Sequence, residues 1–196
     1  MAPADPELRE LVKEMNRSKL AERFRNENGE SLAAEGEILP SAVLPVLASS
    51  KAGEKRVFPM KWGFAGPKKG LLINARVETA ADKPTFRESW EKHRCVIPAS
   101  WYFEWEHDEK KKAGQKYALR PEEQGLVWLA GLYRMEEGLP VFVILTRPAE
   151  ENLAWMHDRM PVMLLKDAAE MWIRTDSDPK ALSEKCLTNV IWDKAV

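Results

Sequence analysis

The chain has 196 residues, 44% of them apolar, and its 30 basic and 31 acidic side chains leave a net charge of −1. This length suits one compact domain, the apolar fraction argues against a disordered chain, and the charge balance is not typical of a nucleic-acid-binding protein. The apolar runs are too short to cross a bilayer, no secretory signal is found, and the two cysteines, Cys95 and Cys186, do not predict a disulfide framework, so we expect a cytoplasmic protein.

The first predicted element is a helix over about residues 6–16. Asp5 is a typical N-cap residue and Pro6 suits the first helical position. Apolar residues then recur at positions i, i+3, i+4 and i+7 from Leu8 to Met15, as on one face of a helix. A polar stretch follows and ends in a predicted turn at Asn28 and Gly29.

The rest of the chain predicts many strands and a few helices. Residues 38–47 contain Pro40 and Pro45 and are at best an irregular or edge strand. Strands are predicted at 57–64, 71–77, 95–105, 116–119, 127–133 and 141–146, and helices at 84–92, 149–156, 167–173 and 179–185. Residues 109–112 predict a solvated hairpin loop. Because strands and helices do not alternate regularly, we expect a single α+β domain over 1–196, with a mostly antiparallel, barrel-like sheet and flanking helices.

Three polar strings stand inside apolar, strand-like runs, where folded proteins normally avoid polar groups. The first is Asn-Ala-Arg-Val-Glu-Thr at 74–79. Asn74 either satisfies backbone groups in a turn or orients a substrate. Arg76 either binds a phosphate or pairs with Glu78 or Glu104.

The second string contains Glu104, and the third begins with His157. With the period of two of a strand, Trp101, Phe103 and Trp105 share one face, and Glu104 lies on the other. Glu104 either points to water or is partly desolvated, which would raise its pKa toward neutrality and suit it to proton transfer. His157, in His-Asp-Arg-Met-Pro, either makes a helix-dipole contact or serves as an acid–base group.

Other chemistries lack support in the sequence. The histidines and cysteines have no known metal-ligand spacing, no glycine-rich phosphate loop occurs, and there is no nucleophile-elbow serine. We therefore expect no metal, no other cofactor and no membrane partner, and we expect a monomer.

The three strings, together with others in the same order, resemble the SOS-response-associated peptidase (SRAP) family. The shared strings are Lys-Trp-Gly-Phe at 61–64, the Asn74 string, Phe-Arg at 86–87, Arg-Cys-Val-Ile-Pro at 94–98, Phe-Glu-Trp at 103–105, Ala-Gly-Leu-Tyr at 130–133, Leu-Thr at 145–146 and the His157 string. Each is weak alone, but their order and spacing hold over about a hundred residues of the chain.

The resemblance implies a compact α+β fold that binds single-stranded DNA in a positively charged groove. In such proteins an N-terminal cysteine captures the aldehyde of an abasic site as a thiazolidine, a covalent DNA–protein crosslink that shields the lesion in DNA repair. By position, Asn74 would orient the N-terminus and the sugar, Glu104 would act as general acid–base, and His157 would assist sugar opening and imine formation. The DNA groove would be lined by Trp62, Arg76, Phe86, Thr146 and Arg159.

The sequence departs from the family at its start. Family members begin Met-Cys-Gly-Arg, whereas this sequence begins Met-Ala-Pro-Ala. Neither Cys95 nor Cys186 has a free α-amine beside its thiol, so we expect the chain as written to form no thiazolidine. Three explanations compete: an incomplete start, which we favour, a natural member without the nucleophile, or a different amine such as that of Ala2.

Two further functions stay open at this point. The chain could be a non-catalytic module that binds single-stranded DNA with strong salt dependence. It could also be a peptidase or amidase, as the family name suggests, with Glu104 and His157 as its acid–base pair.

Overall fold

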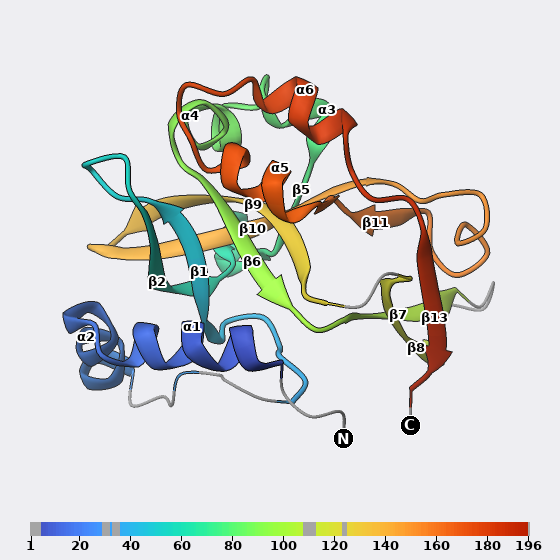
Figure 1. The fold of residues 1–196 in the computed structure, drawn as a ribbon, viewed down its shortest axis with the longest axis horizontal. Coiled ribbons are helices and arrows are strands. Elements are labelled where there is room, and N and C mark those ends of the chain that lie inside the picture. Colours follow the sequence, from blue (N-terminus) through green and yellow to red (C-terminus); the bar gives the residue numbers. More distant parts are fainter. Residues whose placement is uncertain (1–4, 29–31, 33–35, 108–112, 123–124, 196) are drawn as a thin grey trace.

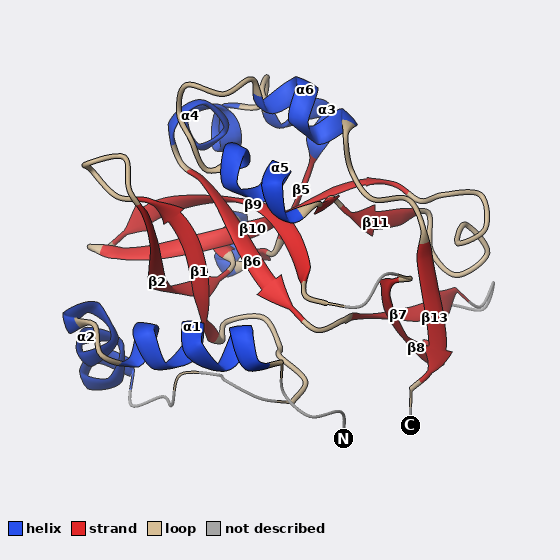
Figure 2. Ribbon diagram, in the orientation of Figure 1, coloured by secondary structure: helices blue, strands red, loops and turns tan. Residues whose placement is uncertain are grey.

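A closed, barrel-like sheet forms the centre of the molecule, and helices cover it on two sides (Figures 1 and 2). The computed structural model describes residues 5–28, 32, 36–107, 113–122 and 125–195. The predicted α+β class is confirmed. Among the described residues, no helix is long and apolar enough to cross a membrane.

Five strands close the barrel, and the last of them is shared with the candidate site. They are β1 (Val43–Ser49), β2 (Lys55–Trp62), β6 (Arg94–Ala99), β9 (Val127–Glu136) and β10 (Leu139–Pro148). Strand β1 pairs antiparallel with β2 and β6, and β9 pairs antiparallel with β6 and β10. The ring closes where β10 runs parallel to β2. Strand β10 extends beyond the residues that pair with β2 and β9, so its second half is available to pair with other strands.

Short strands extend the barrel or form separate sheets. The strands β5 (Asn74–Arg76) and β11 (Arg159–Pro161) join β10, and β12 (Met163–Leu164) joins β9. A hairpin of β3 (Phe64–Ala65) and β4 (Leu71–Leu72) encloses the turn η1 (Pro67–Lys69). A separate three-stranded sheet contains β7 (Tyr102–His107), β8 (Ala113–Pro121) and β13 (Val190–Lys194).

The helices lie in two groups (Figure 1). One group is α1 (Pro6–Asn16) and α2 (Lys19–Asn28), and α1 packs on β1 and β2. The other group is α3 (Val77–Ala80), α4 (Pro84–Lys92), α5 (Lys166–Trp172) and α6 (Pro179–Glu184). The large apolar side chains Met15 and Trp172, one from each group, are both fully buried. Burial of one face of each helix against the barrel is the main force that holds these layers together.

Several predicted elements are confirmed, and their local signals explain why. Helix α1 begins at Pro6, and the Asp5 carboxylate accepts hydrogen bonds from the backbone N–H groups of Glu7, at 2.8 Å, and Leu8, at 3.4 Å. Helix α4 covers the predicted residues 84–92, with Pro84 in its first turn. The strands predicted near 57–64, 116–119, 127–133 and 141–146 correspond to β2, β8, β9 and β10.

The structure departs from the sequence-based expectations in several places. No element was predicted for the polar stretch before Asn28, which forms helix α2, and residues 149–156 form turns rather than the predicted helix. The run 95–105 is two strands in different sheets, because the chain bends at Ser100. The stretch predicted as irregular or edge contains β1, an inner strand of the barrel. Residues 109–112, predicted as a hairpin loop, lie outside the described residues.

Candidate functional site

The second half of β10 brings two of the three polar strings together. Strand β5 runs parallel to it, with Asn74 opposite Ile144 and Arg76 opposite Thr146. Strand β11 runs antiparallel along the same stretch and places Arg159 opposite Pro148. Strings that are about eighty residues apart in the sequence therefore meet on one strand.

The alternation of side chains along β5 presents polar groups to solvent. Ala75 is only 3% exposed, whereas Asn74 and Arg76 on either side of it are exposed. Successive residues of a strand point to opposite faces, so these two side chains share the outer face of β5. Both Asn74 and Arg76 are therefore accessible to a ligand.

Arg159 connects the two strings through a two-pronged ion pair with Glu78. Its Nη1 lies 2.5 Å from Glu78 Oε1 and its Nη2 lies 2.8 Å from Oε2. Nη2 also donates to the backbone carbonyl of Thr146 at 2.6 Å. The hydrogen bonds from Arg159 lower the pKa of the Glu78 carboxyl, and Arg76 adds a smaller effect in the same direction. The Arg159 guanidinium, predicted to line the DNA groove, is thus engaged with a carboxylate in this structure.

Thr146 is a buried residue of β10 that contacts both β5 and Arg159. Its side chain is buried, and its hydroxyl oxygen lies 3.5 Å from the backbone carbonyl of Ala75, at the limit of a hydrogen bond. Its own carbonyl accepts the bond from Arg159. Thr146 therefore links β5 to β11.

His157 stands just before β11 and is held by the backbone of that strand. His157 Nδ1 lies 2.9 Å from the backbone nitrogen of Arg159 and 3.1 Å from its carbonyl oxygen, so Nδ1 has a partner there as an acceptor or as a donor. The Asp158 carboxylate lies 3.2 Å from the same Nδ1. These backbone contacts fix the orientation of the imidazole, as acid–base chemistry requires.

Glu104 comes from a different sheet from Asn74. It lies on β7 opposite Tyr117 of β8, is half-buried, and accepts a hydrogen bond from the Trp105 backbone N–H at 3.3 Å. Burial raises the pKa of the neighbouring Tyr102 hydroxyl, and the negative charge of Glu104 raises it further. Figure 1 shows β7 and β11 toward the same end of the molecule.

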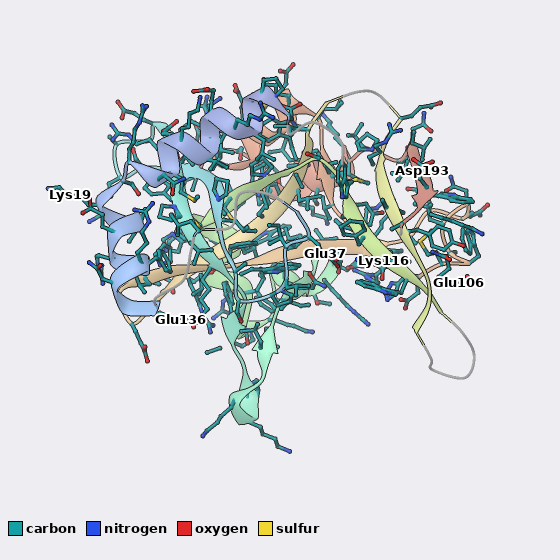
Figure 3. The ribbon with its side chains drawn as sticks, turned by 90° about the horizontal axis from the view of Figure 1, so that it is seen from below. Lys19, Glu37, Glu106, Lys116, Glu136 and Asp193 are labelled. Atoms are coloured by element: carbon teal, nitrogen blue, oxygen red, sulfur yellow. The ribbon has the colours of Figure 1, made fainter. Side chains whose placement is uncertain are left out.

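The other face of β7 is occupied by a lysine that two aromatic rings surround. Lys116 Nζ lies 4.2 Å from the ring centre of Phe103 and 5.1 Å from that of Trp105, and it pairs with Glu37 at 2.5 Å (Figure 3). The prediction that Phe103 and Trp105 share one face of this strand is confirmed. Since side chains alternate along a strand, Glu104 points away from this lysine.

Two residues predicted to stack on DNA differ in their accessibility. Trp62 is half-buried, and its Nε1 donates to the Ile73 carbonyl at 3.0 Å. Phe86 is only 7% exposed and packs in the core, with its ring centre 6.0 Å from that of Phe64. The prediction for Phe86 is corrected here, because a buried ring on the inner face of α4 has no surface for a base to stack on.

Sequence reasoning did not find an aromatic cluster beside the site. The ring centres of Tyr117, Trp155 and Trp192 lie 5.3 to 5.4 Å apart in edge-to-face contacts. This cluster joins the segment before His157 to the small sheet that holds Glu104. Its members are far apart in the sequence and follow no motif, so no sequence signal could have grouped them. Among the described residues, no group of histidine, cysteine, aspartate and glutamate side chains could hold a metal ion.

Comparison with known proteins agrees with this arrangement of strings. A sequence model of the family described as SOS response associated peptidase (SRAP) matches residues 9–194. The chain belongs to the SRAP family. The sequence resemblance is thereby confirmed over almost the whole chain, and it includes the Asn74, Glu104 and His157 strings.

The chain is similar to several proteins named abasic site processing proteins. It is 34% identical over 148 residues to the abasic site processing protein YoaM of Bacillus subtilis, a match that covers 69% of this chain and 63% of that protein. It is 31% identical over 145 residues to the abasic site processing protein YedK of Escherichia coli, covering 71% and 64%. The matched region is thus less than two thirds of the length of either relative.

Solved structures support the fold. The crystal structure of a protein from Bacteroides thetaiotaomicron superposes with a TM-score of 0.70 at 19% sequence identity, covering 94% of this chain and 86% of that one. A phage-related protein from Bordetella bronchiseptica gives a TM-score of 0.69 at 20% identity, covering 91% of each chain.

Proposed function

We propose that this chain recognises abasic sites in single-stranded DNA and holds them for covalent capture. The observation that carries this proposal is the joining of the Asn74 and His157 strings along β10, with Arg159 and Glu78 as the connection. The relatives named abasic site processing proteins support the choice of lesion. The exposed Arg76 beside Asn74 supports a DNA backbone as the ligand.

The chemistry that fits these residues is the capture of an aldehyde by an N-terminal cysteine, a residue that the sequence as written does not carry. The α-amine adds to the ring-opened sugar aldehyde and water leaves, giving an imine, and the thiol then adds across the carbon–nitrogen double bond to close a thiazolidine. Asn74 would orient the amine and the sugar, His157 would assist the opening of the sugar and imine formation, and Glu104 would act as general acid–base. Holding the amine and thiol beside the aldehyde makes both additions effectively intramolecular.

A denaturing-gel crosslinking assay tests this proposal. Single-stranded DNA with one abasic site is incubated with the chain as given and with the same chain extended by Met-Cys-Gly-Arg and a short spacer. We expect a heat-resistant crosslink from the extended form only. A serine in place of the added cysteine is the matched control, because it keeps the α-amine but cannot form a thiazolidine.

Site variants of the extended form then assign the roles. Asn74→Ala and His157→Ala should slow crosslinking, while DNA binding measured by fluorescence anisotropy persists. If the extended form binds abasic DNA but never crosslinks, the chain is a binding module without the chemistry. Turnover on peptides without any affinity for DNA would instead favour the peptidase activity that the family name suggests.

A further inference from the structure

The β3–β4 hairpin presents two adjacent lysines in a backbone conformation that L-residues rarely adopt. The φ angle is +55° at Lys68 and +60° at Lys69, both in the left-handed region. The turn is closed by hydrogen bonds from the Gly66 N–H to the Gly70 carbonyl, at 2.8 Å, and from the Gly70 N–H to the Pro67 carbonyl, at 2.9 Å. Backbone strain of this kind clusters at ligand-binding sites, which directs attention to what the two lysines do.

Neither lysine gains a contact that would offset this strain. Both are exposed, and neither forms a hydrogen bond or an ion pair with any residue that the structure describes. Most other residues accept the left-handed region no better than lysine, whereas glycine enters it at no steric cost. Two glycines at these positions would give a turn with less backbone strain. The hairpin instead carries two lysines, whose positive charges lie in solvent.

The base of the hairpin is firmly held. The Ala65 N–H donates to both carboxylate oxygens of Glu136, at 3.0 and 3.2 Å, and the Ala65 carbonyl accepts from Arg134 Nη2 at 3.1 Å. On the other side, Trp62 donates to the Ile73 carbonyl at 3.0 Å. Figure 3 shows the hairpin projecting from the body of the molecule, so a braced base supports an extended tip.

The tip lies close to the candidate site along the chain. Strand β4 leads through Ile73 directly into Asn74, so Asn74 lies five positions after Lys69. Five steps of extended chain span at most about 18 Å. Phosphates of one strand recur about every 3.4 Å along the axis of duplex DNA and lie farther apart on an extended single strand, so the lysines can contact a strand only a few phosphates from a lesion held at Asn74.

We propose that Lys68 and Lys69 form a phosphate clamp that grips the DNA backbone beside the abasic site. This inference rests on the proposed function and adds a second anchor point outside the pairing of β5, β10 and β11. Two ammonium groups on a braced hairpin attract phosphates without reading the base sequence. The clamp would hold the strand in place while the lesion is presented to Asn74 and His157.

The test removes both charges and the strain together. In Lys68→Gly/Lys69→Gly, we expect binding to oligothymidylate, with and without one abasic site, to weaken on the order of tenfold at about 50 mM salt. The slope of log affinity against log salt should become shallower by about 1.4, since each phosphate contact on a single strand contributes about 0.7. The melting temperature should stay the same or rise, because glycine relaxes the turn. A merely structural role would instead lower it.

Two further variants separate the outcomes. Lys19→Ala/Lys51→Ala removes the same two charges from exposed positions on α2 and on the turn after β1, and it should bind like the unaltered chain. Lys68→Arg/Lys69→Arg should keep the affinity. The clamp is disproved if the unaltered chain binds DNA and the glycine variant matches it, or if both charge-removing variants weaken binding equally. If the unaltered chain itself shows no salt-dependent DNA binding, the proposed function fails first.

Discussion

Two arginines, Arg94 and Arg159, each hold distant segments together, and they do so with different partners. Arg94 is only 3% exposed, and its guanidinium donates to backbone carbonyls of Trp90 and Trp172, each at 2.8 Å, and of Glu91 at 3.0 Å. It therefore ties the end of α4 to the end of α5, where helix carbonyls lack partners within their own helix. Burial lowers the pKa of Arg94, yet the guanidinium stays charged at neutral pH.

Arg159 instead depends on a side chain that water can reach. The Glu78 carboxylate is 42% exposed, and the buried Nε of Arg159 has no partner among the residues that the structure describes. A carboxylate can exchange its partner for water or for a ligand, whereas buried helix carbonyls cannot. The difference indicates that Arg94 maintains the fold, while Arg159 maintains a site that can rearrange.

The largest expected effect comes from Arg94→Met. The methionine fills much of the volume but leaves buried carbonyls without donors, each costing about 1–3 kcal/mol. We expect the free energy of unfolding to fall by at least about 3 kcal/mol, because the carbonyls of Trp90, Glu91 and Trp172 all lose their donor. Urea denaturation monitored by tryptophan fluorescence measures it.

Arg94→Lys is the matched control for that measurement. Lysine keeps the charge but has no planar fork to reach carbonyls from two helices at once. An intermediate loss of stability is expected. A loss below about 1 kcal/mol for Arg94→Met would contradict the assignment of Arg94 to the fold.

The contrast between these regions also explains which parts of the fold could be predicted. The start of α1 follows from neighbouring residues, Asp5 and Pro6, so sequence alone identified it. Strand β1 was misjudged because Pro45 is normally confined to edges. Pro45 lies opposite Pro59, outside the short stretch where β6 pairs with Leu47 and Ala48, so its missing N–H disrupts no pairing on that side.

The sequence predicted which residues belong to the candidate site, but not how the strands bring them together in space. The residue types of Asn74 and His157 marked them for chemistry, and the family resemblance assigned them roles. That β10 would join them depends on a parallel pairing of β5 with residues about seventy positions away, which no local pattern encodes. The partner of Arg159 was missed for the same reason, because Glu78 is 81 residues away in the sequence.

We expect a smaller loss of stability from methionine at Arg159 than from methionine at Arg94. Arg159→Met leaves a Glu78 carboxylate that can turn to water, so we expect the free energy of unfolding to fall by about 1 kcal/mol, much less than for Arg94→Met. The backbone N–H that binds His157 Nδ1 at 2.9 Å is retained in this variant. The orientation of the imidazole should persist, and two-dimensional nitrogen NMR of the histidine ring would detect it. A loss of stability equal to that of Arg94→Met would remove the distinction between the two arginines.

The smallest expected effect is the pH dependence of the Glu78 contribution. Its pKa is lower in the folded protein than its ordinary value, chiefly through the Arg159 hydrogen bonds, so the unfolded chain binds the proton more readily. The stabilisation is complete above the ordinary glutamate pKa of about 4.3 and is lost as pH falls through the lower folded value. Because the carboxylate is partly exposed, we expect a contribution below about 1 kcal/mol. The difference in unfolding free energy between the unaltered chain and Glu78→Gln, measured from pH 7 downward, should therefore shrink through this acid range and be insensitive to pH above it. A difference that stayed constant across the acid range would mean that the carboxylate charge does not stabilise the connection, and that Arg159 is held mainly by the Thr146 carbonyl.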